Sequence, residues 1–451
     1  MPRASIPARA SQSTVHVFVC ACNAPFCLPS CHRELLTLIS VDTHKLRTIS
    51  LIGLAQVVAS ASSQYLPAVI SEPGGQALGI SPTTFFVGVS VALVTSALVG
   101  PTVGRMVDKF GGRPMLMLSN ILYAIGLLLL SMADGITMIM VANLVLGCAL
   151  ACGQFEAAFA TLVMLFGKNS RNAITGITLI AGFASFVGWT VSVQILELWG
   201  WQGVCRFWAG VHLLFALPLH ALIPAARQSE PALDKSVQGS GSPAGAAVTE
   251  PSRRMGQDDK RPGPATPIQS NRVKGILMAY VFAANAFVGM GLMMHLPGLL
   301  QVFGVSMAAA FTIGSLVGPA QVLGRLMDFF VMRKWHPLVG TRLAALTHPV
   351  GAALMLVFGT PFATAFVVLH GTGNGVLIMS RGTLPLAIFG ALGYGRMQGW
   401  LMLPAKLAQA CAPFLFGMAL TDWGTGTLWM TGILGLSTFA ALCLIKRSPA
   451  R

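Results

Sequence analysis

Twelve apolar runs, each long enough to cross a lipid bilayer, constrain this 451-residue chain more than any other feature of its sequence. Spanning the hydrocarbon core of a bilayer takes about 20 apolar residues in helical form, because no water is present there to bond the backbone. Only 10% of the residues are charged and 54% are hydrophobic, whereas soluble domains carry about 25% charge. We therefore expect an all-α polytopic membrane protein with 12 transmembrane helices. The runs lie near residues 49–70, 83–103, 115–133, 137–165, 173–195, 203–224, 275–300, 307–323, 341–360, 362–390, 397–420 and 425–446.

The runs fall into two groups of six, separated by a polar stretch that is rich in Pro, Gly and Ser. Such a stretch cannot form a hydrophobic core, so we expect it to be a flexible linker. We expect five parts, which are a disordered N-terminal segment, a first six-helix bundle, a linker, a second six-helix bundle and a short tail. Their expected bounds are 1–48, 49–224, 225–273, 274–446 and 447–451.

The basic residues set the expected orientation in the membrane. The net charge is +15, which in a soluble protein would suggest nucleic acid. Of the 29 Lys and Arg residues, however, 26 lie in the N-terminal segment, in the loops that follow even-numbered runs, in the linker or at the C-terminus. The opposite loops carry Glu72, Asp134, Glu197 and Asp422 instead. The positive-inside rule then predicts a multi-pass protein of the cell (inner) membrane with both termini in the cytoplasm and no nucleic-acid partner.

The first 48 residues contain a cluster of metal-ligating residue types, but its spacing matches no familiar zinc pattern. We therefore predict no metal site there and no cofactor. No methionine lies between Met1 and Met106, so we expect the native chain to start near Val41, at a start codon other than that for Met. Cysteines within the apolar runs behave as small hydrophobic residues and predict no disulfides. The cluster consists of Cys20, Cys22, Cys27, Cys31 and His32.

Two segments repeat between the halves. The run Gly104-Arg105-Met106-Val107-Asp108 returns 220 residues later as Gly324-Arg325-Leu326-Met327-Asp328. The triplet 165–167 returns at 388–390, an offset of 223. Parallel repeats of this kind place a substrate site near the middle of the membrane, between the halves.

The loop after the second run resembles the signature loop of the major facilitator superfamily, and the second copy stands where that family places it. The resemblance implies two parallel-repeat bundles and a loop that stabilises one access state, so its residues would govern gating. The second copy lacks a Gly at the position of Gly111. Because the fifth run lacks the Gly-Pro signature of drug–proton antiporters, the sequence looks nearer the monocarboxylate and oxalate–formate carriers. The gating residues implied are Gly104, Arg105, Asp108, Lys109, Gly111, Arg113, Gly324, Arg325 and Asp328.

Three charges lie deep inside the apolar runs, namely Glu156, Arg381 and Lys406. Charges at this depth cost at least about 2.5 kcal/mol each, so each needs a function or a partner. Counted along their helices at about 1.5 Å per residue, all three lie about 13–16 Å from the cytoplasmic ends. We expect Arg381 to bind a carboxylate, Lys406 to add a second positive charge, and Glu156 to take up a proton or to pair with Arg381. The alternative is a structural bridge between Glu156 and Arg381, with Lys406 lining a wet crevice.

Further polar residues are weaker candidates for substrate contact, namely Gln154, Asn374, His295 and Tyr65. The stretch 370–375 is rich in Gly, so it either unwinds locally and exposes backbone groups or forms a glycine contact face. Arg206 lies at a helix end and reads as an interfacial anchor.

Together these observations predict a secondary active transporter that moves a small organic anion by alternating access, with proton coupling or exchange. The expected partners are the lipid bilayer, a small-molecule substrate and a coupling proton, and a monomer is favoured. No Walker-type nucleotide motif and no zinc-protease motif occur in the sequence, so we predict neither an ATPase nor another enzyme. An efflux pump for lipophilic compounds and a non-transporting receptor remain as alternatives.

Overall fold

The computed structural model describes residues 43–225, 271–332 and 335–445. The predictions for the cysteine cluster, for a start near Val41, for most of the linker and for the tail concern residues outside these ranges.

Helices make up almost all of the described chain, as the apolar runs predict. The first half contains α2 (Thr43–Ser60), η1 (Ala61–Tyr65), α3 (Leu66–Leu78), α4 (Pro82–Phe110), α5 (Gly112–Ser131), α6 (Ile136–Gly153), α7 (Phe155–Phe166), η2 (Gly167–Ser170), α8 (Arg171–Ala181), α9 (Ala184–Val211), η3 (His212–Ala216) and α10 (Leu217–Ala221). The second half contains α11 (Asn271–Val302), α12 (Met307–Ser315), α13 (Val317–Phe330), α14 (Pro337–Phe358), η6 (Thr360–Phe362), α15 (Ala363–Phe389), α16 (Tyr394–Trp423) and α17 (Gly426–Leu444).

The described residues form eleven apolar helical segments long enough to cross a membrane. Ten of these segments have 19 to 36 residues, but Arg171–Ala221 has 51. At about 1.5 Å per residue the long segment would measure more than twice the roughly 30 Å hydrocarbon core. Its backbone turns at Gly200, where φ is 68°, so it contains two crossings. The total is then twelve, as predicted.

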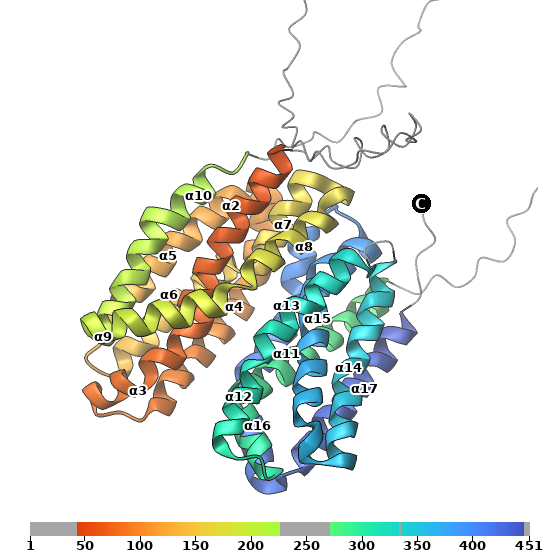
Figure 1. The fold of residues 1–451 in the computed structure, drawn as a ribbon. Coiled ribbons are helices and arrows are strands. Elements are labelled where there is room, and N and C mark those ends of the chain that lie inside the picture. Colours follow the sequence, from red (N-terminus) through yellow and green to blue (C-terminus); the bar gives the residue numbers. More distant parts are fainter. Residues whose placement is uncertain (1–42, 226–270, 333–334, 446–451) are drawn as a thin grey trace, which may run out of the picture.

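The helices form two bundles that lie side by side (Figure 1). We call the end of the molecule at which α2 starts and α10 ends the terminal face, and it lies at the top of this view, whereas α17 ends lower, on the right. The two halves share apolar packing, because Leu386 and Tyr394 of the second half belong to a core cluster formed mainly by the first half. Tyr394 is 1% exposed.

Glycines end equivalent helices in the two halves. Gly167 follows α7 with φ 55° and Gly390 follows α15 with φ 86°, and these are the two glycines of the repeated triplet. Gly111 separates α4 from α5 with φ 88°. A residue with a Cβ is strained in this left-handed region, so each glycine allows a sharp end to its helix.

Of the two alternatives for the stretch 370–375, local unwinding is not observed, because α15 is helical from Ala363 to Phe389. Its glycines instead form a contact face. A Cβ at Gly371 would crowd Ala320, and one at Gly375 would overlap the backbone of Gln321. Weak helix formers are tolerated here because close packing on α13 compensates for their low propensity.

The helical path is interrupted instead in the fourth crossing, at Gln154. This residue has φ −77° and ψ 179°, an extended conformation, and separates α6 from α7. The break lies two residues before Glu156 and therefore sets the direction of that side chain.

Candidate functional site

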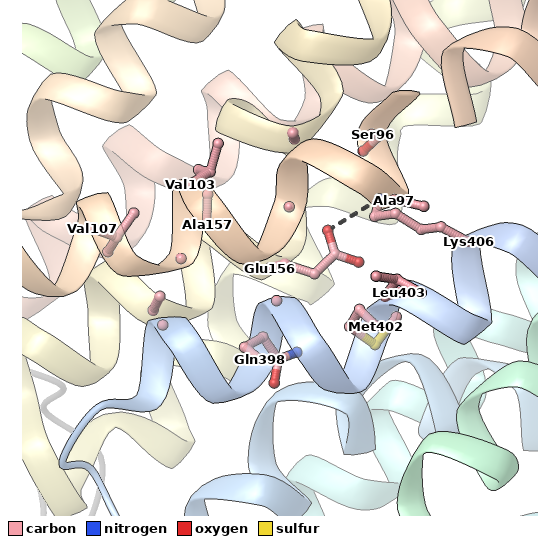
Figure 2. A pocket seen from close by; sticks show the side chains of 16 residues that line it. Ser96, Ala97, Val103, Val107, Glu156, Ala157, Gln398, Met402, Leu403 and Lys406 are labelled. Carbon is pink, nitrogen blue, oxygen red and sulfur yellow. Dashed lines mark ion pairs between the residues drawn. The ribbon is translucent and has the colours of Figure 1, made fainter. Parts of the chain in front are cut away.

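An ion pair joins the two halves deep inside the molecule. The Nζ atom of Lys406 on α16 lies 3.5 Å from Oε2 of Glu156 on α7. The two side chains are 11% and 19% exposed, so the pair is largely removed from solvent. Figure 2 shows the two groups facing each other across the space between α4, α7 and α16.

A small pocket surrounds this pair, with about 390 Å³ of space not filled by atoms, part of which is open to solvent. Its walls come from α4, from the end of α6 and start of α7, and from α16. Apart from the ion pair, its polar side chains are those of Ser96 and Gln398. The amide oxygen of Gln398 is buried and has no hydrogen-bond partner among the described residues.

Arg381 on α15 lies near the pair. Its guanidinium interacts electrostatically with Glu156, but its Nε is buried and unpartnered in the described part of the chain. The backbone oxygen of Arg381 accepts a hydrogen bond of 3.0 Å from Gln398 Nε2, which fixes α15 against α16. Glu156 therefore pairs with Lys406, and the alternative of a bridge to Arg381 is not the arrangement observed.

Arg325 is a further buried cation whose position the sequence did not reveal. It was expected in a gating loop, yet it lies inside α13 and is 5% exposed. Its Nη1 donates to the backbone oxygen of Thr178 at 2.8 Å, and its Nε has no partner among the described residues. The guanidinium also rests against Gly182. Thr178 and Gly182 lie 7 and 11 residues after Arg171, where the fifth crossing starts, which is about 10–16 Å along the helix. These contacts place the charge of Arg325 between the halves at that depth.

Tyr65 lies beside Arg325 rather than beside the ion pair. Its phenol interacts electrostatically with the guanidinium and contacts the Ser185 hydroxyl. Gly188 brings the fifth crossing close to Tyr65, since an added Cβ would come within 3.1 Å of the Tyr65 Cβ. Small residues of the fifth crossing thus serve close helix packing.

The other candidates for substrate contact form hydrogen bonds with residues of neighbouring helical segments. His295 Nε2 lies 2.8 Å from the backbone oxygen of Pro413. Asn374 accepts a weak bond of 3.4 Å from Asn285, within a separate pocket of the second bundle. Gln154 Nε2 donates to Ser63 Oγ at 3.0 Å. The structure does not bring these three residues together, and their contact with substrate stays a prediction.

The signature loop closes the terminal face. Both carboxylate oxygens of Asp108 accept backbone N–H bonds at the start of α16, from Gly395 at 2.8 Å and from Arg396 at 2.7 Å. A Cβ on Gly104 would overlap the carbonyl of Gly395, so the two helices touch backbone to backbone. In the repeat, Asp328 interacts electrostatically with Arg171 at the start of α8.

The remaining predicted gating residues are arranged around this contact. Arg105 is exposed and donates to Thr102 at 3.1 Å, and the Lys109 ammonium lies 5.0 Å from the Phe110 ring centre. Arg113 lies in the first turn of α5. Gly324 differs from Gly104, because a Cβ there would overlap the carbonyl of Thr372 within the same half.

Comparison with known proteins identifies this architecture. A family model described as Major Facilitator Superfamily matches residues 52–393. The chain belongs to this superfamily. It is therefore a multi-pass membrane transporter, and the members of its family are transporters rather than enzymes. Its finer branch stays a prediction.

A curated transporter shares sequence similarity with part of this chain. The sialic acid transporter NanX of Escherichia coli (strain K12) is 28% identical over 117 residues, which are 25% of this chain and 28% of that protein. The match thus spans little more than a quarter of the relative's length.

Solved structures share the fold at low identity. The fucose:proton symporter FucP of E. coli matches with a TM-score of 0.65 and 12% identity, over 89% of this chain and 98% of that one. The human organic anion transporter TETRAN matches with a TM-score of 0.64 and 15% identity, over 88% of this chain and 99% of that one. The proton:xylose symporter XylE matches with a TM-score of 0.59 and 13% identity, over 92% of this chain and 95% of that one.

Proposed function

We propose that this protein is a secondary active transporter that moves a small organic anion by alternating access, with the substrate carboxylate bound at Arg381. The observation that carries the proposal is the guanidinium of Arg381, which lies beside the Glu156–Lys406 pair with a buried, unpartnered Nε. A planar guanidinium binds a carboxylate through two parallel hydrogen bonds.

The charge balance between the halves also favours an anion. Apart from Asp328, which interacts with Arg171, the inner charges described above are one carboxylate, Glu156, and three cations, Arg325, Arg381 and Lys406. A buried charge without a counter-ion is strongly unfavourable. An anionic substrate would offset part of this positive excess, whereas a neutral or cationic one would not.

The names of two similar proteins agree with an acidic substrate. One is a sialic acid transporter and another an organic anion transporter. The other two are sugar symporters driven by protons. A sugar acid or another small carboxylate, moved together with or against a proton, is the substrate class that we propose.

We further propose that the terminal face is cytoplasmic and that the protein lies in the inner membrane. The positions of the basic residues support this orientation. With Asp108 bonded to α16, the terminal face is closed. The conformation described here would then be one in which the substrate site is shut off from the cytoplasm.

Counterflow in liposomes tests the proposal. Purified protein would be reconstituted in vesicles loaded with unlabelled mono- and dicarboxylates, sugar acids or neutral sugars, and entry of the labelled compound would be measured. We expect saturable exchange of at least one acid and no exchange of its neutral analogue. Silence across the acids with folded protein, or equal exchange of the neutral analogue, would refute an anion carrier and favour efflux of apolar compounds.

Glu156→Gln separates coupling from binding. If the Glu156 carboxylate carries the coupling proton, counterflow should persist within about threefold, while accumulation driven by a pH gradient should disappear. The measurement is uptake with and without an imposed pH gradient. Glu72→Gln is the matched control, because Glu72 is exposed and bonded only to Gln76. Accumulation that survives in Glu156→Gln would exclude this role.

A further inference from the structure

Two irregular backbone segments of the first half meet the break at Gln154. The first crossing contains a π-turn at η1, and the sixth contains another at η3. Ser62 Oγ in η1 lies 2.8 Å from His212 Nε2 in η3, and Ser63 Oγ accepts from Gln154 Nε2 at 3.0 Å. Wide turns inside helices are rare and concentrate at functional sites.

Tyr123 on α5 connects these segments. Its hydroxyl accepts a hydrogen bond from Gln154 Nε2 at 3.3 Å. Its ring stacks on His212, with the ring centres 4.5 Å apart and the planes at 15°. Both Tyr123 and Gln154 are buried, at 0% and 3% exposure. Moving the Gln154 amide away would leave buried polar groups unpaired, which disfavours any other course of the backbone here.

The side-chain amide of Asn120 fixes which nitrogen of the neutral His212 ring carries the hydrogen. The Nδ2 of Asn120 donates to the backbone oxygen of Leu116 at 2.8 Å and faces His220 Nδ1 at 2.7 Å. Its Oδ1 can only accept, so His212 Nδ1, 3.0 Å away, must carry a hydrogen. In the neutral ring, Nε2 then accepts from the Ser62 hydroxyl. The ring that supports Tyr123 is thus fixed from both sides.

We propose that Tyr123 and Gln154 are positioning residues that aim the Glu156 carboxylate at Lys406. This inference rests on the proposed function, in which Glu156 couples transport to protons. Glu156 stands in the first turn of α7, two residues after the break, so the direction of its side chain follows the backbone of Gln154. A continuous helix, or a break free to vary, would rotate that turn and move the carboxylate away from α16.

Hydrogen exchange on the purified protein tests whether these residues hold the break. Tyr123→Phe removes one hydroxyl, and Gln154→Leu removes the amide at similar volume. We expect the backbone amides of residues 153–158 to exchange at least tenfold faster in both variants, with α5 unchanged. Tyr280→Phe is the control, because Tyr280 is 41% exposed and bonds Ser437 of α17, within the second half. Unchanged exchange at 153–158 in both variants would overturn the proposal, whether or not the protein transports.

A transport measurement tests whether the break positions Glu156. In Tyr123→Phe we expect counterflow within twofold of the wild type, with accumulation in a pH gradient reduced at least fivefold. A role in folding alone would lower both activities by the same factor, and that result would contradict positioning. A wild-type chain that exchanges no acid would refute the proposed function separately, because the hydrogen-exchange result needs no substrate.

Discussion

Replacing Arg381 with glutamine is expected to lower kcat/KM for anion exchange at least 30-fold. Truncating one partner of a buried, hydrogen-bonded charge pair costs about 2–5 kcal/mol, and the lower limit corresponds to roughly 30-fold. Glutamine keeps part of the length and polarity of arginine but has neither the charge nor the second parallel donor. The buried Nε of Arg381 has no partner among the described residues, so its loss should leave the local hydrogen bonds intact.

Arg206→Gln provides the matched control for this experiment. Arg206 is also an arginine within an apolar helix, but its side chain is exposed. Its substitution should leave exchange unchanged. Exchange in Arg381→Gln at the level of Arg206→Gln would remove Arg381 from the binding site. Thermal unfolding in detergent would show whether either variant is destabilised.

Gly104→Ala should reduce turnover at least tenfold, by preventing closure of the terminal face. The single added Cβ would overlap the backbone carbonyl of Gly395, and a backbone cannot move aside as the end of a flexible side chain can. The helices α4 and α16 would have to separate, and the two N–H bonds to Asp108 would lengthen. Hydrogen exchange at residues 394–398 measures this separation directly and should become faster.

Gly100→Ala tests whether contact, rather than loss of a glycine, causes the effect. Gly100 lies one turn earlier on the same helix, and a Cβ there would meet nothing within 4 Å. We expect normal turnover and normal exchange at 394–398 in this variant. Equal losses in the two variants would mean that helix flexibility, not the contact with Gly395, matters at this position.

The regular parts of this architecture follow from the sequence because length and apolarity determine them. Each apolar run is helical, in one helix or in consecutive helices, and the turn at Gly200 lies in the gap between the fifth and sixth runs. Residue counting placed Glu156 and Lys406 at similar depth, and the structure brings them to 3.5 Å. Depth follows from the fixed helical rise, so it can be predicted without knowledge of packing.

Features that depend on the neighbouring helix could not be predicted in this way. The glycines at 370–375 suggested unwinding, but they pack on α13 and remain helical. The break occurs instead at Gln154, whose side-chain amide donates hydrogen bonds to Ser63 and Tyr123 on two other crossings. The motif placed Arg325 at a loop, yet its long side chain extends to Thr178 in the other half. The spacing of residues along the sequence gives no information about such contacts between helices.

The packing of Leu386 and Tyr394 into the core of the first half has a thermal consequence. If the halves part at the terminal face, these side chains pass from an apolar core into water, with a positive change in heat capacity. The free-energy difference between the closed and open conformations should therefore depend non-linearly on temperature. Because apolar burial weakens on cooling, lower temperature should shift this balance toward the open form.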